Sequence, residues 1–324
     1  MAFRLRISTI AAVVGLAVAA TSSFAQTFPT KPIKLVLPYT PGGVVDFIGR
    51  TLAQNLGDVL GQPVVADNRP GAGGIVGTDV VARSPADGYT LLLMDPAIVI
   101  NPTLQDNVPY DLFKQLEPIS VVSSSPLVLV VAPGLNVKTF DEFIAYAKAN
   151  PGKLNFASAG IGTTPHLSGE MLKQITGIQA THIPYKGIGA SFTDMMANKV
   201  QFSFSSIAGA LPFTSDNRVV ALATTGDTPN PVYADKPTVA DAGIKGFSVD
   251  LWLTVFAPAG LPDAVKTKLN DAITVALAKP QLKEAFAKVG ASPRGTTVAA
   301  AAEFVKADFE KWRKVITDAN IKKN

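Results

Sequence analysis

Apolar and polar positions form two successive patterns near the start of the chain. Ile33–Leu37 is a mainly apolar run of the length of a buried strand, and from Phe47 onward apolar residues recur at helical spacing. Between the two patterns lies Pro38-Tyr39-Thr40-Pro41-Gly42-Gly43, whose prolines and glycines are typical of a loop. This stretch therefore predicts a strand, a glycine-rich loop and a helix.

Short apolar runs and helical patterns continue to alternate along the chain. Strands are predicted at residues 64–66, 89–94, 154–157, 181–187 (with a turn), 201–206 and 219–224, and helices at residues 78–82, 139–147, 190–197, 262–279, 280–289 and 299–319. Such alternation is typical of an α/β protein with parallel strands, which end at one edge of their sheet. The loops after the first three strands, including Asp95-Pro96, are therefore predicted to meet at one edge.

The N-terminus has the pattern of a secretory signal peptide. Arg4 and Arg6 precede an apolar run over residues 10–20, and the small residues Ser23 and Ala25 fit a cleavage site after Ala25. The run is too short for a membrane helix, which needs about 18 apolar residues. We expect residues 1–25 to be a signal peptide and the mature chain to be exported.

The mature chain is about twice the usual size of a single domain, so two domains are expected. Residues 116–131 and 247–257 read as extended passages without a helix, and each suits a crossing from one domain to the other. The predicted first domain is discontinuous, with residues 26–126 and 248–324, and the second is residues 127–247. Two crossing strands would then form a hinge.

Composition excludes several classes of function. The formal net charge is +4 with scattered Lys and Arg, which is not the pattern of a nucleic-acid-binding protein. With no Cys, the chain has no disulfide, thiolate site or lipoprotein anchor, and its two histidines form no metal-binding motif. We therefore expect no metal and no cofactor.

Enzyme and nucleotide motifs are also missing from the sequence. Ser158 has Phe156 where a serine hydrolase elbow needs glycine. A second glycine-rich segment, residues 71–77, has Val76 where the dinucleotide fingerprint needs its third glycine, and no Walker Lys-Ser/Thr pair follows. We interpret this segment as structural, a close packing of helix against sheet, and expect a protein that is not an enzyme.

A second loop repeats the design of the first. Residues 158–166 follow a predicted strand, contain Gly160 and Gly162, and lead into a helix. Free N–H groups at a helix start attract anions, and no Lys or Arg lies between Lys34 and Arg50. Two such helix starts on separate domains can grip one anion in the cleft between them.

Several side chains near these loops have either a ligand-binding or a structural role. Tyr39 and Tyr185 stand beside turns and either line the cleft or pack. His166 at a helix start is more often structural than catalytic, and Trp252 is more often a core residue than a ligand contact. Asp46 either contacts the ligand or stabilises the helix dipole, which contributes about 0.3–1 kcal/mol.

Several ordered motifs carry a family resemblance over essentially the whole mature chain. They are residues 30–33, 38–46, 67–74, 87–91, 160–167 and 184–187, with sequences TKPI, PYTPGGVVD, DNRPGAGG, DGYTL, GIGTTPHL and PYKG. In these motifs the chain resembles the substrate-binding proteins of tripartite tricarboxylate transporters, the periplasmic Bug receptors. The resemblance implies a type II periplasmic-binding-protein fold, in which two α/β domains joined by crossing strands close on a small carboxylate.

The resemblance also implies the binding loops, residues 39–46 and 158–166, with ordered water contributing. The expected ligand-binding residues are Tyr39, Thr40, Gly42, Gly43, Val44, Asp46, Asp95, Ser158, Gly160, Gly162, Thr163, Thr164, His166, Tyr185, Ser205 and Ser206. The chain departs from the family pattern at Val44-Val45 and at Ser205-Ser206. We hypothesise that Val44 makes the pocket less polar and favours a ligand with an apolar body.

The expected function is that of a periplasmic solute receptor. It would capture a dicarboxylate or tricarboxylate, an amino acid or an aromatic or aliphatic acid, and deliver it as a monomer to the membrane components of a tripartite tricarboxylate transporter. The alternative is a sensor receptor whose ligand-bound form engages a two-component histidine kinase. The sequence does not separate the two, and a neighbouring permease or kinase gene would.

Overall fold

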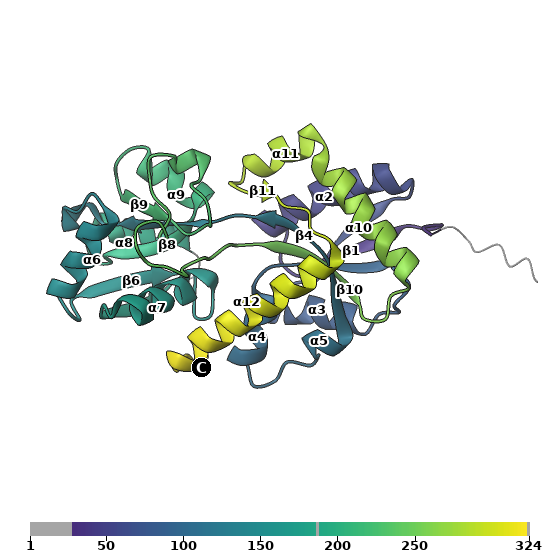
Figure 1. Cartoon of the computed structure of the whole chain (residues 1–324), viewed down its shortest axis with the longest axis horizontal. Helices are drawn as coiled ribbons and strands as arrows, with labels where there is room; N and C mark the ends of the chain where they lie inside the picture. The colour runs from purple at the N-terminus through teal and green to yellow at the C-terminus, as the bar shows by residue number, and fades with distance from the viewer. Residues whose placement is uncertain (1–27, 186–187, 323–324) are drawn as a thin grey trace, which may run out of the picture.

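Two lobes, each built on its own β-sheet, lie side by side along the long axis of the molecule (Figure 1). The computed structural model describes residues 28–185 and 188–322. The predicted signal peptide and the Lys186-Gly187 part of the family motif lie outside the described residues. Within the described ranges, no helix has both the length and the apolarity that a membrane crossing requires.

The first lobe has a six-stranded mixed sheet. Its strand order is β11-β4-β10-β3-β1-β2, with bounds β1 Ile33–Leu37, β2 Val64–Asn68, β3 Thr90–Met94, β4 Leu116–Ser124, β10 Leu253–Pro258 and β11 Ser292–Pro293. Strand β1 is parallel to β2 and β3, whereas β10 runs antiparallel to β3 and β4. The loops after β1, β2 and β3 thus share one edge, as predicted.

Helices cover both faces of this sheet. They are α2 Val44–Leu60, α3 Ile75–Ala82, α4 Ala97–Leu104, α5 Leu112–Gln115, α10 Asp263–Ala278, α11 Pro280–Ala287 and α12 Val298–Asp318, with a 3₁₀ turn at Ala72–Gly74. Helices α2, α10 and α11 pack together on one face, and α3, α4 and α12 on the other. Because both faces are buried, strands such as β1 and β3 are mostly apolar.

The second lobe has a five-stranded sheet in the order β7-β6-β8-β5-β9. Its strands are β5 Leu127–Val131, β6 Leu154–Ser158, β7 Ala180–Pro184, β8 Phe202–Ser206 and β9 Val220–Thr224; its helices are α6 Phe140–Ala149, α7 Thr164–Thr176, α8 Ser191–Met196 and α9 Ile207–Thr214, with 3₁₀ turns at Pro133–Leu135, Ile188–Ala190 and Pro231–Tyr233. Helix α6 begins with a capping box, in which Thr139 and Glu142 satisfy each other's backbone N–H groups.

The chain crosses between the lobes twice. It leaves β4 through Ser125-Pro126 and enters β5, and it returns through residues 250–252 into β10. The two crossings touch, because the Leu251 amide donates to the Ser125 carbonyl at 2.9 Å and Pro126 forms a bridge with Asp250. The crossings lie where the extended passages were predicted, while the outer limits of the two domains stay a prediction.

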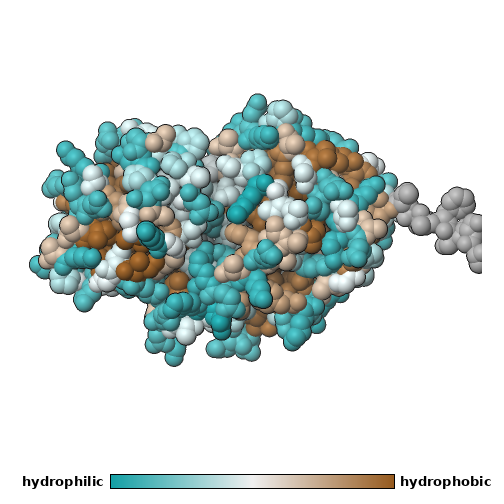
Figure 2. Space-filling view, in the orientation of Figure 1, coloured by the Kyte–Doolittle hydropathy of each residue, from teal (hydrophilic) through white to brown (hydrophobic). Residues whose placement is uncertain are grey.

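The structure also contains helices that the sequence did not predict. Helix α4 follows β3 directly and has five of its eight residues buried, so it has no polar face to give a helical period. Helix α9 carries Pro212 inside it, which the sequence pattern reads as a breaker. On the face drawn in Figure 2, hydrophobic residues form small separate patches on both lobes within a mainly hydrophilic surface.

Candidate functional site

The loop after β1 holds its shape through the carboxylate of Asp46. That carboxylate accepts hydrogen bonds from the Gly42 amide at 3.0 Å, from Nε of Arg50 at 3.0 Å and from Nδ2 of Asn68 at 2.9 Å. Burial raises the pKa of Asp46, but these three donors outweigh it and bring the pKa to about 2. Asp46 is therefore ionised, and its charge is paired with that of Arg50.

Helix α2 begins at this loop with amide groups that have no acceptor. The first bond into the helix runs from the Phe47 amide to the Gly43 carbonyl at 2.9 Å. Among the residues that the structure describes, none accepts from the amides of Val44, Val45 and Asp46. These groups carry the positive end of the helix dipole.

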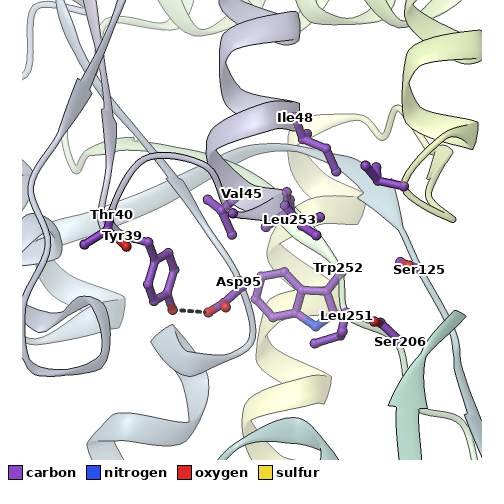
Figure 3. Close-up of a pocket in the computed structure, with 13 residues that line it drawn as sticks. Tyr39, Thr40, Val45, Ile48, Asp95, Ser125, Ser206, Leu251, Trp252 and Leu253 are labelled. Carbon is purple, nitrogen blue, oxygen red and sulfur yellow. Dashed lines mark hydrogen bonds between the residues drawn. The ribbon is translucent and has the colours of Figure 1, made fainter. Parts of the chain in front are cut away.

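A cavity of about 310 Å³, called here the apolar chamber, lies against this helix start. It is lined by Tyr39, Thr40, Gly43, Val44, Val45, Ile48, Asp95, Ser125, Ser206, Leu251, Trp252, Leu253 and Val289. Figure 3 shows Val45, Leu253, Leu251 and the Trp252 indole around it. Most of its wall is hydrocarbon, so it suits an apolar group better than a hydrated one.

A second cavity of about 360 Å³, called here the loop chamber, lies between α4 of the first lobe and the start of α7 in the second. It is lined by Tyr39, Gly73, Asp95, Ala97, Ile100, Asn101, Leu104, Ala159, Ile161, Gly162, Thr163, Thr164, Pro165, Ile188, Ser206 and Leu251. Four residues line both chambers, namely Tyr39, Asp95, Ser206 and Leu251. The two chambers therefore adjoin and form one cleft between the lobes.

The junction of the chambers is marked by a hydrogen-bonded pair. The Tyr39 hydroxyl donates to Oδ1 of Asp95 at 2.8 Å (Figure 3), and the Ala97 amide donates to the same oxygen at 2.9 Å. Burial raises the pKa of Asp95, and burial together with the Asp95 charge raises that of Tyr39. No Lys or Arg is among the residues that line either chamber.

The loop after β6 is held by its own side chains. Oγ1 of Thr163 donates to the Gly160 carbonyl at 2.7 Å, and the Gly162 amide donates to Nδ1 of His166 at 3.0 Å. The ring of His166 stacks on His182 at 3.7 Å, and His182 Nε2 lies 2.6 Å from Oγ of Ser158. Burial lowers the pKa of His166 to about 3 and that of His182 to about 4, so both rings are neutral at pH 7.

Helix α7 begins beside the loop chamber in the same way as α2. The Leu167 amide makes the first bond into the helix, to the Thr163 carbonyl at 3.0 Å. The amides of Thr164 and His166 have no acceptor in the described part of the chain, and Pro165 has no N–H. Each lobe thus presents one helix start to the cleft.

The sequence-predicted site residues divide into two groups. Those that line the chambers are Tyr39, Thr40, Gly43, Val44, Asp95, Gly162, Thr163, Thr164 and Ser206. Those that do not are Gly42, Asp46, Ser158, Gly160, His166, Tyr185 and Ser205. Ligand contact stays a prediction for both groups.

Members of the second group make internal contacts. Tyr185 donates to Oδ2 of Asp194 at 2.7 Å, and burial and that carboxylate raise its pKa to about 12. Ser205 is fully buried and donates to the Ser206 carbonyl at 3.2 Å. Asp46 and His166 likewise accept hydrogen bonds from amides of their own loops.

Other lining residues were not nominated from the sequence. Trp252 is only 1% exposed, as expected of a core residue, yet its indole also lines the apolar chamber. Gly73, from the segment read as structural, and Ala97, Ile100 and Asn101 of α4 line the loop chamber. The predicted meeting of the loops after β1, β2 and β3 was the signal that could have identified Gly73 and Ala97.

Comparison with known proteins gives one consistent relationship. A sequence model of the family described as "Tripartite tricarboxylate transporter family receptor" matches residues 48–321. The protein BugT of Bordetella pertussis is 35% identical over 324 residues, covering 98% of this chain and 99% of BugT. A protein from the tcbD-tcbE intergenic region of Pseudomonas sp. strain P51 is 35% identical over 316 residues, covering 96% of this chain and 94% of that protein.

Solved structures agree with the sequence relationship. The R. palustris protein Rpa4515, solved with adipate, is 32% identical with a TM-score of 0.76, over 91% of this chain and 99% of that one. MatC from Rhodopseudomonas palustris, solved with bound malate, is 28% identical with a TM-score of 0.71, over 89% of this chain and 100% of MatC. The fold is the type II periplasmic-binding-protein fold that the resemblance implied. In residues 28–185 and 188–322, no group of three or more His, Cys, Asp or Glu side chains is placed to hold a metal ion.

Proposed function

Because the chain belongs to the receptor family of tripartite tricarboxylate transporters, a family of periplasmic binding proteins rather than enzymes, we propose that it captures a small organic carboxylate in its cleft. It would then deliver the acid to the membrane components of such a transporter. Relatives solved with adipate and with malate support a carboxylate as the ligand class.

The observation that carries this proposal is the pair of helix starts at the cleft. Val44 and Val45 of α2 line the apolar chamber, and Thr164 of α7 lines the loop chamber. Their amides have no acceptor among the described residues and lie at the positive ends of two helix dipoles. An anion can therefore be bound without Lys or Arg, and a carboxylate oxygen has the size and charge to accept these bonds.

The walls of the apolar chamber support a ligand with an apolar body. Val44 is 45% exposed and adds hydrocarbon surface that a bound ligand would cover, whereas the lining residues Ile48 and Leu253 are at most 4% exposed. Burial of apolar area contributes about 25 cal/mol per Å². We infer an acid whose aliphatic or aromatic part occupies this chamber, in agreement with the hypothesis about Val44.

Binding is proposed to hold the lobes together. A ligand that touches both helix starts stabilises only the arrangement in which both are near, so it shifts the population toward the closed form. We propose that residues 26–126 with 248–324, and residues 127–247, move as two units about the crossings at 125–126 and 250–252. This closed form is the one that a membrane partner would recognise.

Ligand identification tests the proposal directly. Mass spectrometry of small molecules released from the purified protein should give an organic acid, chemically unchanged. Calorimetry with a panel of dicarboxylates, tricarboxylates, amino acids and aromatic acids should then give heat for that acid. If no acid gives heat or a thermal shift, the proposed function is wrong.

Delivery requires a separate test. Membrane vesicles that contain the transporter's membrane components should take up the identified acid only when this receptor is added. If the receptor instead raises autophosphorylation of a histidine kinase and supports no uptake, the sensor alternative replaces transport.

A further inference from the structure

Asp95 has one carboxylate oxygen that the protein leaves available at the centre of the cleft. Its Oδ1 accepts from both Tyr39 and the Ala97 amide. No other described residue donates a hydrogen bond to Oδ2 or pairs with it, and the one further backbone contact of the carboxylate is with the amide of Asp95 itself. The residue lies at the end of β3, where the two chambers join.

This placement is unfavourable for a simple carboxylate ligand. Asp95 is the one Asp or Glu among the residues that line the chambers, and no cation lines them to balance its charge. The two donors on Oδ1 favour the ionised form, but burial opposes it more strongly, so the pKa of Asp95 is raised. With Asp95 ionised, a bound carboxylate would meet a like charge between mainly apolar walls, where repulsion is stronger than in water.

A hydrogen-bond donor on the ligand removes this conflict. A hydroxyl or ammonium group can donate to Oδ2, because an ionised carboxylate accepts strongly from both. The carboxylate of the same ligand can then be held by the amides at the helix starts, away from Asp95. The wall of the apolar chamber would cover the rest of the molecule.

Resting on the proposed function, we propose that the ligand is a hydroxy acid or an amino acid whose hydroxyl or ammonium group is bound by Asp95. Asp95 then acts as the residue that distinguishes such acids from their unsubstituted analogues. The rejection of unsubstituted acids follows from the cost of leaving a buried carboxylate oxygen without a donor.

Matched acids test this inference by calorimetry. The pairs are succinate and malate, adipate and 2-aminoadipate, and 3-phenylpropanoate with 3-phenyllactate and phenylalanine. In the unaltered protein, a donor-bearing acid should bind at least tenfold more tightly than its unsubstituted partner. In Asp95→Asn that preference should disappear, because the amide can donate to an anion. Asp106→Asn, an exposed site outside both chambers, should leave the preference unchanged.

A second measurement does not depend on a variant that folds. Repeating the titrations in buffers of different ionisation enthalpy reports protons taken up on binding. Donor-bearing acids should bind with no net proton uptake. If unsubstituted acids bind as tightly as their donor-bearing partners, or if every acid binds with uptake of one proton, the inference is wrong. Asp95 would then be neutralised by protonation rather than paired with a donor on the ligand. In both cases carboxylate capture would stand; if no acid in the wider panel binds, the proposed function itself fails.

Discussion

The indole N–H of Trp252 donates to Oδ2 of Asp308 at 2.8 Å, which connects the wall of the apolar chamber to helix α12. The indole N–H of Trp312 donates to the same oxygen at 2.9 Å. Both tryptophans are at most 1% exposed and share one polar partner, but only Trp252 lines a chamber. The two side chains therefore share deep burial and a hydrogen-bond partner but differ in their access to the apolar chamber.

This difference predicts how fluorescence responds to ligand. The chain contains two tryptophans, so each can be observed alone. In Trp312→Phe, addition of an acid that binds should change the intensity or wavelength of the Trp252 emission. In Trp252→Phe, the same addition should leave the Trp312 emission nearly unchanged. Equal responses in both variants would mean that the signal reports a global change and not occupation of the apolar chamber.

Val44→Asp should weaken binding of the natural ligand. The substitution places a negative charge in the first turn of α2, beside amides proposed to hold a carboxylate. A like charge at about 4 Å costs about 1 kcal/mol in water and more where water is excluded, so we expect a loss of about tenfold or more. Val275→Asp on α10, which is 53% exposed and is not among the residues that line either chamber, is the control and should bind normally. Unchanged affinity of Val44→Asp in calorimetry would contradict the proposed ligand position.

Stability should fall in mild acid because of the two stacked histidines. The folded pKa values are about 3 for His166 and about 4 for His182, lowered by burial first and then by nearby positive charge, against about 6.5 in the unfolded chain. Between these values the unfolded state binds more protons. The contribution to stability is therefore complete above about pH 6.5 and is lost as the pH falls toward 4.

Urea unfolding between pH 7 and 4.5 measures this effect. Each histidine can contribute up to about 1.4 kcal/mol per pH unit in that window. His182→Gln removes one titrating ring and should give a shallower dependence of the unfolding free energy on pH. A slope that is the same in the variant would show that other groups cause the acid loss.

The local elements were predictable because their signals are local. Thr139 and Glu142 show the start of α6, and Gly61 and Gly177 end α2 and α7 in the left-handed conformation that glycine adopts readily. The two glycine-rich loops that lead into α2 and α7 were predicted from the same kind of local signal. Helix α4 was missed because its residues Ile98, Val99 and Ile100 are all buried, which removes the helical period.

The site was only partly predictable because its shape depends on tertiary placement. The sequence shows the glycines of both loops but not that Asp46, Ser158 and His166 accept from three of their amides. It also does not distinguish Val289 of the apolar chamber from any other apolar residue. These side-chain contacts occupy three of the loop N–H groups and leave fewer of them for an anion. Residue type alone therefore overstates the number of available N–H donors.

Gly162→Ala should weaken binding by holding the lobes apart. Gly162 has φ +77°, and a Cβ there would clash with Cδ2 of Leu104 on α4 of the opposite lobe. Gly160 in the same loop also has a positive φ, of +128°, but among the described residues its Cβ would approach no atom closer than 3.8 Å. Both substitutions carry backbone strain, whereas only Gly162→Ala puts an added atom against the other lobe.

The comparison of these two glycines separates local strain from lobe closure. Gly160→Ala and Gly162→Ala should both lower the melting temperature, and Gly162→Ala should in addition lower ligand affinity more than Gly160→Ala does. Shortening the opposing side chain in Gly162→Ala/Leu104→Ala should restore part of that affinity, because it makes room for the new methyl group. If the double variant binds no better than Gly162→Ala, the contact between Gly162 and Leu104 does not limit closure.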